Sequence, residues 1–157
     1  LFGIFAGITF WFPKMFGRRL HEPLGKLHWL LTLLFFNAVM FPMFNLGIAG
    51  MPRRIYDYTQ YAHLAHVGGL NQWMSLAAFG LGAAQLLFIV NVFWSLFAGT
   101  RAPANPWNAT TLEWSTPSPP PHGNFTILPT VYHGPYEYSV PGLAEDWLPQ
   151  HRPPTRH

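Results

Sequence analysis

Two adjacent arginines, Arg53 and Arg54, lie where one long apolar run ends and shortly before the next begins. Charged side chains at a membrane boundary are costly unless an anionic group meets them. A guanidinium is permanently charged and binds a carboxylate or a phosphate through two parallel hydrogen bonds. Because Pro52 restricts the backbone before the pair, we expect both guanidiniums to stay close to the helix end. The residues alone leave two interpretations: a pair that binds lipid phosphates, or a clamp on a buried anionic cofactor group.

Four other side chains near the membrane boundary, one aspartate and three histidines, could form ion pairs, bind a metal or form hydrogen bonds. Asp57 follows three residues after Arg54 and could form an ion pair with one arginine. His63 and His66 are three residues apart, so on a helix they share a face. Two histidines without a third ligand are weak grounds for a metal site, and we expect them to form hydrogen bonds instead. For His28, which opens the second apolar run, we expect a structural role at the membrane edge.

Polar side chains also occur inside the second apolar run. Thr32, Asn37 and Asn45 either line a water path or connect neighbouring helices, and the sequence leaves both interpretations open. The chain has no cysteine, no phosphate-binding glycine loop, no paired carboxylates and no catalytic triad on a plausible scaffold. Nothing in it indicates a hydrolase, a thiolate metal site or a cysteine nucleophile.

The composition indicates a membrane protein. Of the 157 residues, 50% are apolar and 10% are charged, whereas about 25% of the residues of a soluble domain are charged. The net charge of +3 is small, and the basic residues lie at the ends of apolar runs rather than in one patch. We therefore expect no nucleic-acid partner.

Three apolar runs predict an all-α membrane protein with a partial first helix and two transmembrane helices. Residues 1–12 are too few to cross a bilayer, which needs about 20 residues, so we expect the chain to start partway along a helix of a larger protein. Residues 27–50 form the second run, in which Pro42 is expected to kink the helix. Residues 70–98 form the third run, with Trp73 and Trp94 as interfacial anchors. Its small residues suit close helix packing: Ala77, Ala78, Gly80, Gly82, Ala83 and Ala84.

The composition changes at Gly99. Twelve of the sixteen prolines follow it, a density that disfavours helices and central strands. We therefore divide the chain into a transmembrane segment, residues 1–98, and a proline-rich tail, residues 99–157. The tail is expected to be extended and to take its order only from contact with the rest of a complex.

Basic residues predict the orientation. Lys14, Arg18, Arg19, Lys26 and Arg101 flank one side of the membrane, against Arg53 and Arg54 on the other. The side with more basic residues is usually cytoplasmic. The tail is therefore expected on the cytoplasmic or matrix side, and the arginine pair on the opposite side.

The order of several motifs resembles the C-terminal part of subunit I of the haem–copper oxidases, the family of cytochrome c oxidase subunit I. The match covers about residues 1–125 and runs in order at matching spacing. Residues 10–17 (FWFPKMFG) resemble the end of the family's tenth helix, and residues 25–29 (GKLHW) the start of the eleventh. Residues 46–54 (LGIAGMPRR), preceded by Phe41-Pro42 and followed by Asp57-Tyr58, resemble the end of that helix. Residues 111–114 (TLEW) and 119–125 (PPPHGNF) resemble the tail after the twelfth.

The resemblance implies a function for the arginine pair and for the whole protein. Arg53 and Arg54 would bind the propionates of two haems, and would tune their potentials electrostatically. The complete enzyme would be a proton-pumping cytochrome c oxidase that reduces dioxygen to water. Its cofactors would be two haems of the a type and copper, ligated by residues outside this chain. Its partners would be the remainder of subunit I, subunits II and III, cytochrome c and membrane lipid, in a bacterial plasma membrane or the mitochondrial inner membrane.

The sequence departs from the family pattern in two respects. Met43-Phe44 stand where a Gln-His pair commonly follows Phe-Pro, and some quinol-oxidising relatives also lack that pair. None of His21, His28, His63 or His66 matches a ligand motif of the family, so no metal ligand and no catalytic residue is assigned. Two alternatives stay open: a quinol oxidase of the same superfamily, and a non-catalytic membrane scaffold whose arginines bind lipid headgroups.

Overall fold

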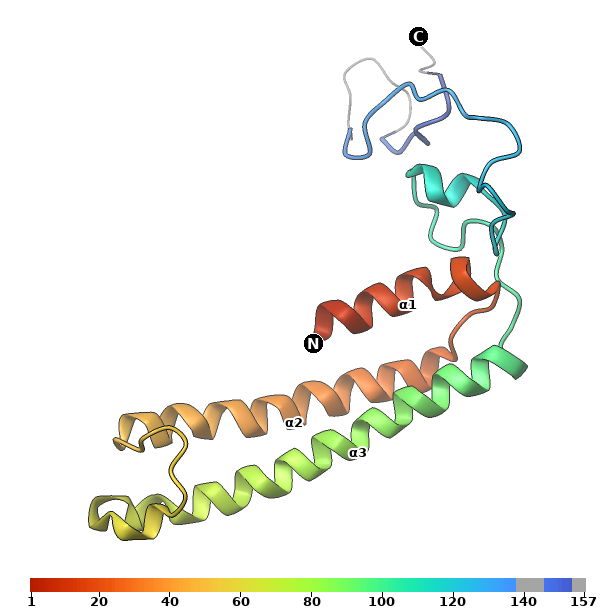
Figure 1. Cartoon of the computed structure of the whole chain (residues 1–157). Helices are drawn as coiled ribbons and strands as arrows, with labels where there is room; N and C mark the ends of the chain where they lie inside the picture. Colours follow the sequence, from red (N-terminus) through yellow and green to blue (C-terminus); the bar gives the residue numbers. More distant parts are fainter. Residues whose placement is uncertain (138–145, 154–157) are drawn as a thin grey trace. The chain divides into compact units, whose positions relative to one another are not determined.

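The computed structural model describes residues 1–137 and 146–153, and the regular secondary structure of these residues is helical (Figure 1). Three α-helices carry the fold: α1 (Phe2–Phe16), α2 (Glu22–Ile48) and α3 (Gly68–Ala98). Short 3₁₀ helices occupy the connections: η1 (Tyr58–Gln60), η2 (Ala62–Val67) and η3 (Leu112–Ser115). The described residues contain no strand beyond one isolated bridge between Arg18 and Arg101. The prediction of an all-α membrane chain with a short first helix is confirmed.

The two long helices have the length and composition of membrane spans. α2 has 27 residues, which at 1.5 Å per residue is about 40 Å, more than the ~30 Å of a bilayer core. α3, with 31 residues, is longer still. Large apolar side chains on both are open to the surroundings, as expected where lipid or other helices would cover them: Leu34, Phe41, Phe44, Leu76, Phe79, Leu86 and Phe93.

The helices begin earlier than the apolar runs predict. α2 starts at Glu22 rather than at residue 27, because Pro23 at its first turn is preorganised for a helix and the acidic Glu22 suits a helix N-terminus. α2 also continues through Pro42 to Ile48. η2 leads directly into α3, which starts at Gly68 rather than at residue 70.

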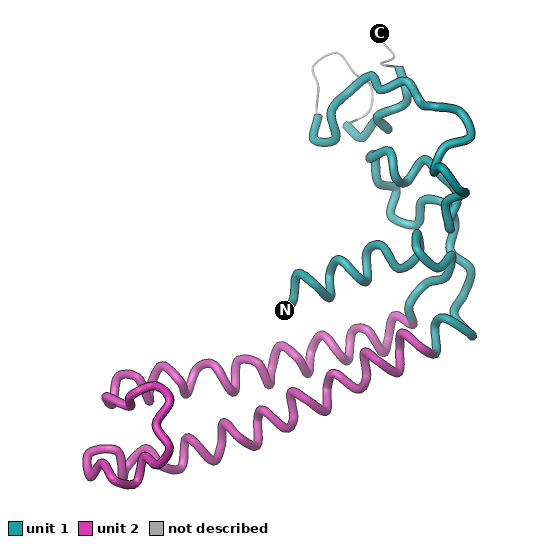
Figure 2. The backbone as a smooth tube through the Cα atoms, in the orientation of Figure 1, with its two compact units in different colours: residues 1–20, 94–157 teal, residues 21–93 magenta. Residues whose placement is uncertain are grey.

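The chain forms two compact units, which are described separately (Figure 2). One unit is His21–Phe93, with α2 and most of α3. The other joins Leu1–Leu20 to the residues from Trp94 onward, with α1, the end of α3 and the tail. The division at residues 98 and 99 rests on composition and stays a prediction.

Small residues let α3 approach α2 in the first unit. Ala77 and Ala84 are buried, and Gly80 lies between them on the helix. A Cβ at Gly80 would come within 2.5 Å of the Phe35 ring, so the contact needs glycine there. Three of the six small residues thus serve the predicted close packing, whereas Ala78, Gly82 and Ala83 are exposed.

Polar side chains form a second set of contacts between α2 and α3. His28 Nε2 and Gln85 Oε1 are 3.2 Å apart, and Gln85 Nε2 donates to Thr32 Oγ1 at 3.2 Å. Thr32 therefore connects the two helices, whereas Asn37 donates to Leu33 O on its own helix and Asn45 is exposed. The role of Gln85 was not predicted, although an amide inside an apolar span often hydrogen-bonds to a neighbouring helix.

Asn91 ties α3 to the start of α2. It is fully buried, its Oδ1 accepts from His21 N–H at 2.9 Å, and its Nδ2 donates to His21 O at 3.1 Å. At about 0.5–1.5 kcal/mol for each hydrogen bond, we expect Asn91→Leu to destabilise the protein by ~1–3 kcal/mol. The thermal unfolding midpoint measures this, with the exposed amide variant Asn45→Leu as control. Equal midpoints for the two variants would contradict the assigned role.

In the second unit the tail packs onto α1. The Nζ atom of buried Lys14 donates to Thr116 O at 2.7 Å and to Ala104 O at 3.0 Å. Trp114 is buried, with its ring edge-on to Phe10 at 5.0 Å, and Lys14 Nζ lies 5.0 Å from the centre of the Trp114 ring. The expectation that the tail takes its order only from other parts of a complex is therefore wrong, because α1 supplies a buried cation and a ring that hold it.

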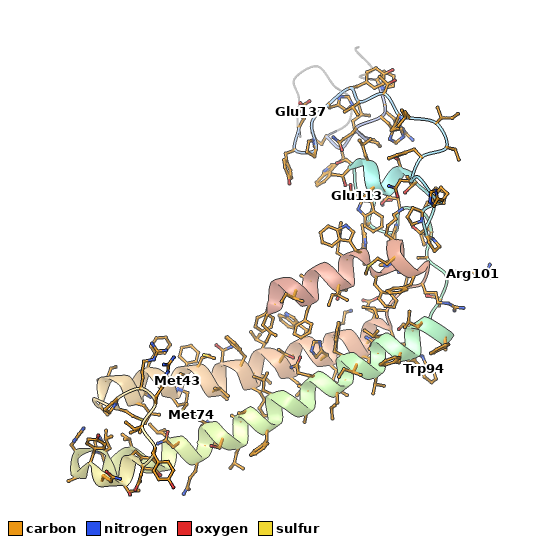
Figure 3. The ribbon with its side chains drawn as sticks, viewed as in Figure 1. Met43, Met74, Trp94, Arg101, Glu113 and Glu137 are labelled. Atoms are coloured by element: carbon orange, nitrogen blue, oxygen red, sulfur yellow. The ribbon has the colours of Figure 1, made fainter. Side chains whose placement is uncertain are left out.

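The tail also contains local structure that its proline content argued against. No proline lies between residues 107 and 116, and η3 forms inside that stretch, where Figure 3 labels Glu113. Further along, buried Gln150 donates through its N–H to Thr110 O and accepts Leu112 N–H at its Oε1. Backbone and side-chain hydrogen bonds therefore replace regular secondary structure in ordering the described part of the tail.

Candidate functional site: the Arg53-Arg54 turn

The way α2 ends determines where the arginine pair lies. Gly50 adopts a left-handed conformation at φ +83°. Its N–H donates to Gly47 O, and the N–H of Met51 donates to Leu46 O, both at 3.0 Å. These two bonds form a Schellman motif, which satisfies the last carbonyls of the helix and turns the chain away from its axis. Arg53 and Arg54 follow in a turn directly beyond the helix end.

Apolar contacts hold the turn on both sides of the arginines. Leu46, Leu64 and Val67 form a buried cluster, and Met51 and Ile55 pack against it. The chain is therefore anchored to the apolar cluster on both sides of the arginine pair, at Met51 and at Ile55. Both arginines are exposed between these two anchors, so their guanidiniums project from a fixed turn rather than from a free loop.

Arg54 has an unusual backbone conformation. Its φ of +60° lies in the left-handed region, where a residue with a Cβ costs about 1–3 kcal/mol. Such strain tends to occur at binding sites, where the surrounding contacts impose it. Because Met51 and Ile55 fix the chain direction here, the left-handed residue sets where the Arg54 side chain leaves the backbone.

Neither guanidinium has an acidic partner within the part of the chain that the structure describes. The ion pair found there joins Lys26 to Glu22, at 2.7 Å, and involves neither arginine. Two adjacent positive charges thus remain available on one turn. Their chemistry fits an anionic group with paired oxygen atoms, such as a carboxylate or a phosphate.

The predicted ion pair between Asp57 and an arginine is wrong. The Asp57 carboxylate instead accepts from Thr59 N–H at 2.8 Å and from Thr59 Oγ at 2.7 Å, capping η1. Aspartate favours this position because a short acceptor side chain can satisfy the free N–H groups of the first turn. These hydrogen bonds, first that from the Thr59 hydroxyl, lower the pKa of Asp57.

The cap should be sensitive to acid. Because its folded-state pKa lies below the unfolded value, Asp57 stabilises the fold above the unfolded pKa, and that contribution disappears as the pH falls through the folded pKa. Asp57→Asn keeps an acceptor but cannot titrate. As the pH falls through the folded-state pKa of Asp57, we expect the unfolding midpoint of the wild type to fall more steeply than that of Asp57→Asn. Parallel pH profiles of the unfolding midpoint would contradict this.

His63 and His66 lie on η2, three residues apart and both exposed. The ring of His63 makes an edge-on contact with Tyr61 at 5.8 Å, and its Nε2 would lie 3.7 Å from a Cβ placed on Gly50. Among residues 1–137 and 146–153, no group of three or more His, Cys, Asp or Glu side chains is arranged to hold a metal ion. His63 therefore packs against the same helix end that presents the arginines.

Comparisons with known proteins identify relatives. Residues 1–81 match the family model described as cytochrome c and quinol oxidase polypeptide I. The chain is 45% identical to the alternative cytochrome c oxidase subunit 1 of Bradyrhizobium diazoefficiens, over 96% of this chain and 26% of the relative. It is 45% identical to cytochrome c oxidase subunit 1 of Synechocystis, over 88% of this chain and 24% of that protein. For the Bacillus subtilis protein of that name the identity is 42%, with 83% of this chain and 21% of the relative covered. The chain thus spans about a quarter of the length of these relatives.

Proposed function

Because the chain belongs to the family of cytochrome c and quinol oxidase polypeptide I, we propose that it is the C-terminal portion of the catalytic subunit of a cytochrome c oxidase. The complete enzyme would reduce dioxygen to water and couple this to proton translocation. Membership of this family implies haem and copper cofactors and a membrane-bound oxidase complex with other subunits. The two helices long enough to span a membrane agree with that setting.

We propose that Arg53 and Arg54 bind haem propionates. The observation that carries this proposal is the pair of exposed guanidiniums on one fixed turn, without an acidic partner among the described residues. A propionate is a carboxylate, and a guanidinium binds it through two charge-assisted hydrogen bonds. Adjacent arginines on one turn could each take a propionate, or could share two propionates of neighbouring haems. The left-handed backbone of Arg54 would hold its side chain apart from that of Arg53.

The roles of this chain's own residues follow from that geometry. Arg53 and Arg54 neutralise the anionic edge of a haem and orient it, while Met51 and Ile55 keep the turn in place. The haems and copper, when bound, supply the electron transfer and the oxygen chemistry. We propose that their ligands come from the rest of subunit I, and that the haems are of the a type.

The setting in the cell follows from the same proposal. The partners would be the remainder of subunit I, subunits II and III, and cytochrome c as electron donor. The membrane would be a bacterial plasma membrane or the mitochondrial inner membrane. The excess of basic residues around Arg18, Arg19 and Arg101 supports a tail on the cytoplasmic or matrix side, with Arg53 and Arg54 opposite.

The experiment is to purify the complex from its native membrane through a tag on this chain. We expect a reduced-minus-oxidised spectrum with a haem a band, and oxygen consumption at least tenfold faster with reduced cytochrome c than with a quinol. Faster oxidation of the quinol would make the protein a quinol oxidase. A complex without a haem signal would support the scaffold function and contradict the proposal.

A further inference from the structure

We propose that Arg18, Arg19 and Arg101, here called the arginine triad, bind the phosphate of an anionic phospholipid. The triad lies in one compact unit, between the ends of α1 and α3 and the start of the tail. Arg18 and Arg101 are paired in an isolated antiparallel bridge. Two backbone hydrogen bonds flank it: Arg19 N–H donates to Thr100 O, and Ala102 N–H donates to Gly17 O, both at 2.9 Å.

The bridge places like charges opposite each other. Residues directly opposite in an antiparallel pair share one face, with Cβ atoms about 4.5–5.5 Å apart, and like charges there are destabilising. In the described ranges, no carboxylate forms an ion pair with any member of the triad. Arg18 Nη1 donates to Gly99 O at 2.6 Å, which uses one of the five donors of its guanidinium. The arrangement therefore calls for an external anion to offset the repulsion.

Arg19 is held in place by an aromatic side chain. Its guanidinium carbon lies 5.8 Å from the centre of the Trp107 ring. Trp107 is in turn fixed to α1, because its Nε1 donates to Phe10 O at 2.9 Å and its ring stacks on Phe10. A cation–π contact of this kind uses none of the N–H donors of the guanidinium, which stay available for an anion. Arg19, the next residue after bridged Arg18, is thus held at a defined position by Trp107.

The surroundings favour a lipid over a free anion. Exposed apolar side chains stand at the ends of the same two helices: Phe16 is 46% exposed, Trp94 60% and Phe97 81%. Figure 3 labels Trp94 near the end of α3, and Arg101 where the tail begins with its side chain directed outward. A ligand that satisfies both features has a phosphate for the arginines and acyl chains for the apolar residues. Clusters of arginine beside apolar spans are the usual sites for anionic headgroups.

The test uses the complete membrane protein that contains this chain, reconstituted in vesicles of phosphatidylcholine with a photoactivatable lipid. One arm carries a phosphatidylglycerol analogue and the other a phosphatidylcholine analogue with the same acyl label. After chymotryptic digestion, we expect the phosphatidylglycerol label on the peptides around residues 16–20 and 97–107. Replacing Arg18 and Arg101 by glutamine should reduce that labelling by about fivefold for each arginine removed.

Three controls separate the outcomes. Arg152→Gln removes an exposed tail arginine outside the triad and should leave the labelling unchanged. In Arg101→Glu, the new carboxylate would face Arg18 across the bridge and form an ion pair with it. We expect this variant to keep the backbone pairing but to lose the lipid labelling. Millimolar inorganic phosphate should not displace the lipid, and displacement would identify a free-anion site and overturn the proposal. Equal labelling by the two analogues, or full labelling of the double glutamine variant, would also overturn it. The outcome does not depend on whether Arg53 and Arg54 bind haem.

Discussion

Replacing Arg54 by glutamine in the complete oxidase is expected to lower the midpoint potential of one haem by several tens of millivolts. Removing a positive charge beside a propionate disfavours the reduced state, so the shift is downward. A charge-assisted hydrogen bond contributes ~1.5–3 kcal/mol, and a shift of ~59 mV in a one-electron potential corresponds to ~1.4 kcal/mol. Arg53→Gln should act in the same direction, on the same haem or on its neighbour. Spectroelectrochemical titration measures both potentials.

Three further variants separate charge from backbone strain. Arg54→Gly removes the side chain and also relieves the cost of the left-handed backbone at φ +60°. If charge is the cause, glycine and glutamine at this position should shift the potential equally. Arg54→Lys keeps the charge but loses the paired hydrogen bonds, and should give an intermediate shift. Arg152→Gln, in the tail, should leave both potentials unchanged. Unaltered potentials for both haems after replacement of either arginine would rule out the clamp.

The second large effect is expected at Lys14. Lys14→Met keeps the apolar length of the side chain but removes the donor to Thr116 O and Ala104 O. Each buried group that loses its partner costs ~1–3 kcal/mol, so the loss of both contacts should weaken the binding of the tail to α1 by ~2–6 kcal/mol. Hydrogen exchange should then accelerate at tail amides held by the packing, among them Trp114 N–H and Ala102 N–H.

Lys26→Met is the matched control for the tail measurement. Lys26 forms an ion pair with Glu22 in which the two side chains are 75% and 71% exposed, and such pairs contribute little. Exchange in the tail should therefore match wild type. If Lys14→Met and Lys26→Met gave the same exchange rates, the buried ammonium would not be what holds the tail on α1.

The sequence predicts the helices well and their contacts less well. The apolar runs at residues 27–50 and 70–98 are long and contain no Asp, Glu, Lys or Arg, so the existence of α2 and α3 follows from hydropathy alone. The start of α2 was predicted too late, because Glu22 and Lys26 are charged and Pro23 usually breaks a helix. At the first turn, however, proline is well suited to a helix. The roles of Gln85 and Asn91 depend on which side of α3 faces α2, and neither helix has a strong apolar–polar division that would reveal it.

At the candidate site, too, features set by neighbouring residues in the sequence were predicted, whereas contacts between distant residues were not. The arginine pair and its exposed position follow from the sequence, because adjacent cations at the end of an apolar run need an anion. The capping of η1 by Asp57 was misread as an ion pair, since a carboxylate three residues from an arginine fits either role. The docking of the tail through Lys14 joins residues about 100 positions apart, which no local pattern in one sequence can indicate.

Whether Arg53 and Arg54 bind haem propionates can be seen in a cryo-electron microscopy map of the complete oxidase that is detailed enough to place side chains around the haems. The distance to measure is that between the guanidinium nitrogens of Arg53 and Arg54 and the nearest propionate oxygens. We expect at least one contact for each arginine at about 2.7–3.2 Å, the range of a hydrogen bond. Guanidiniums more than about 4 Å from every propionate oxygen, facing lipid phosphates or solvent instead, would contradict it.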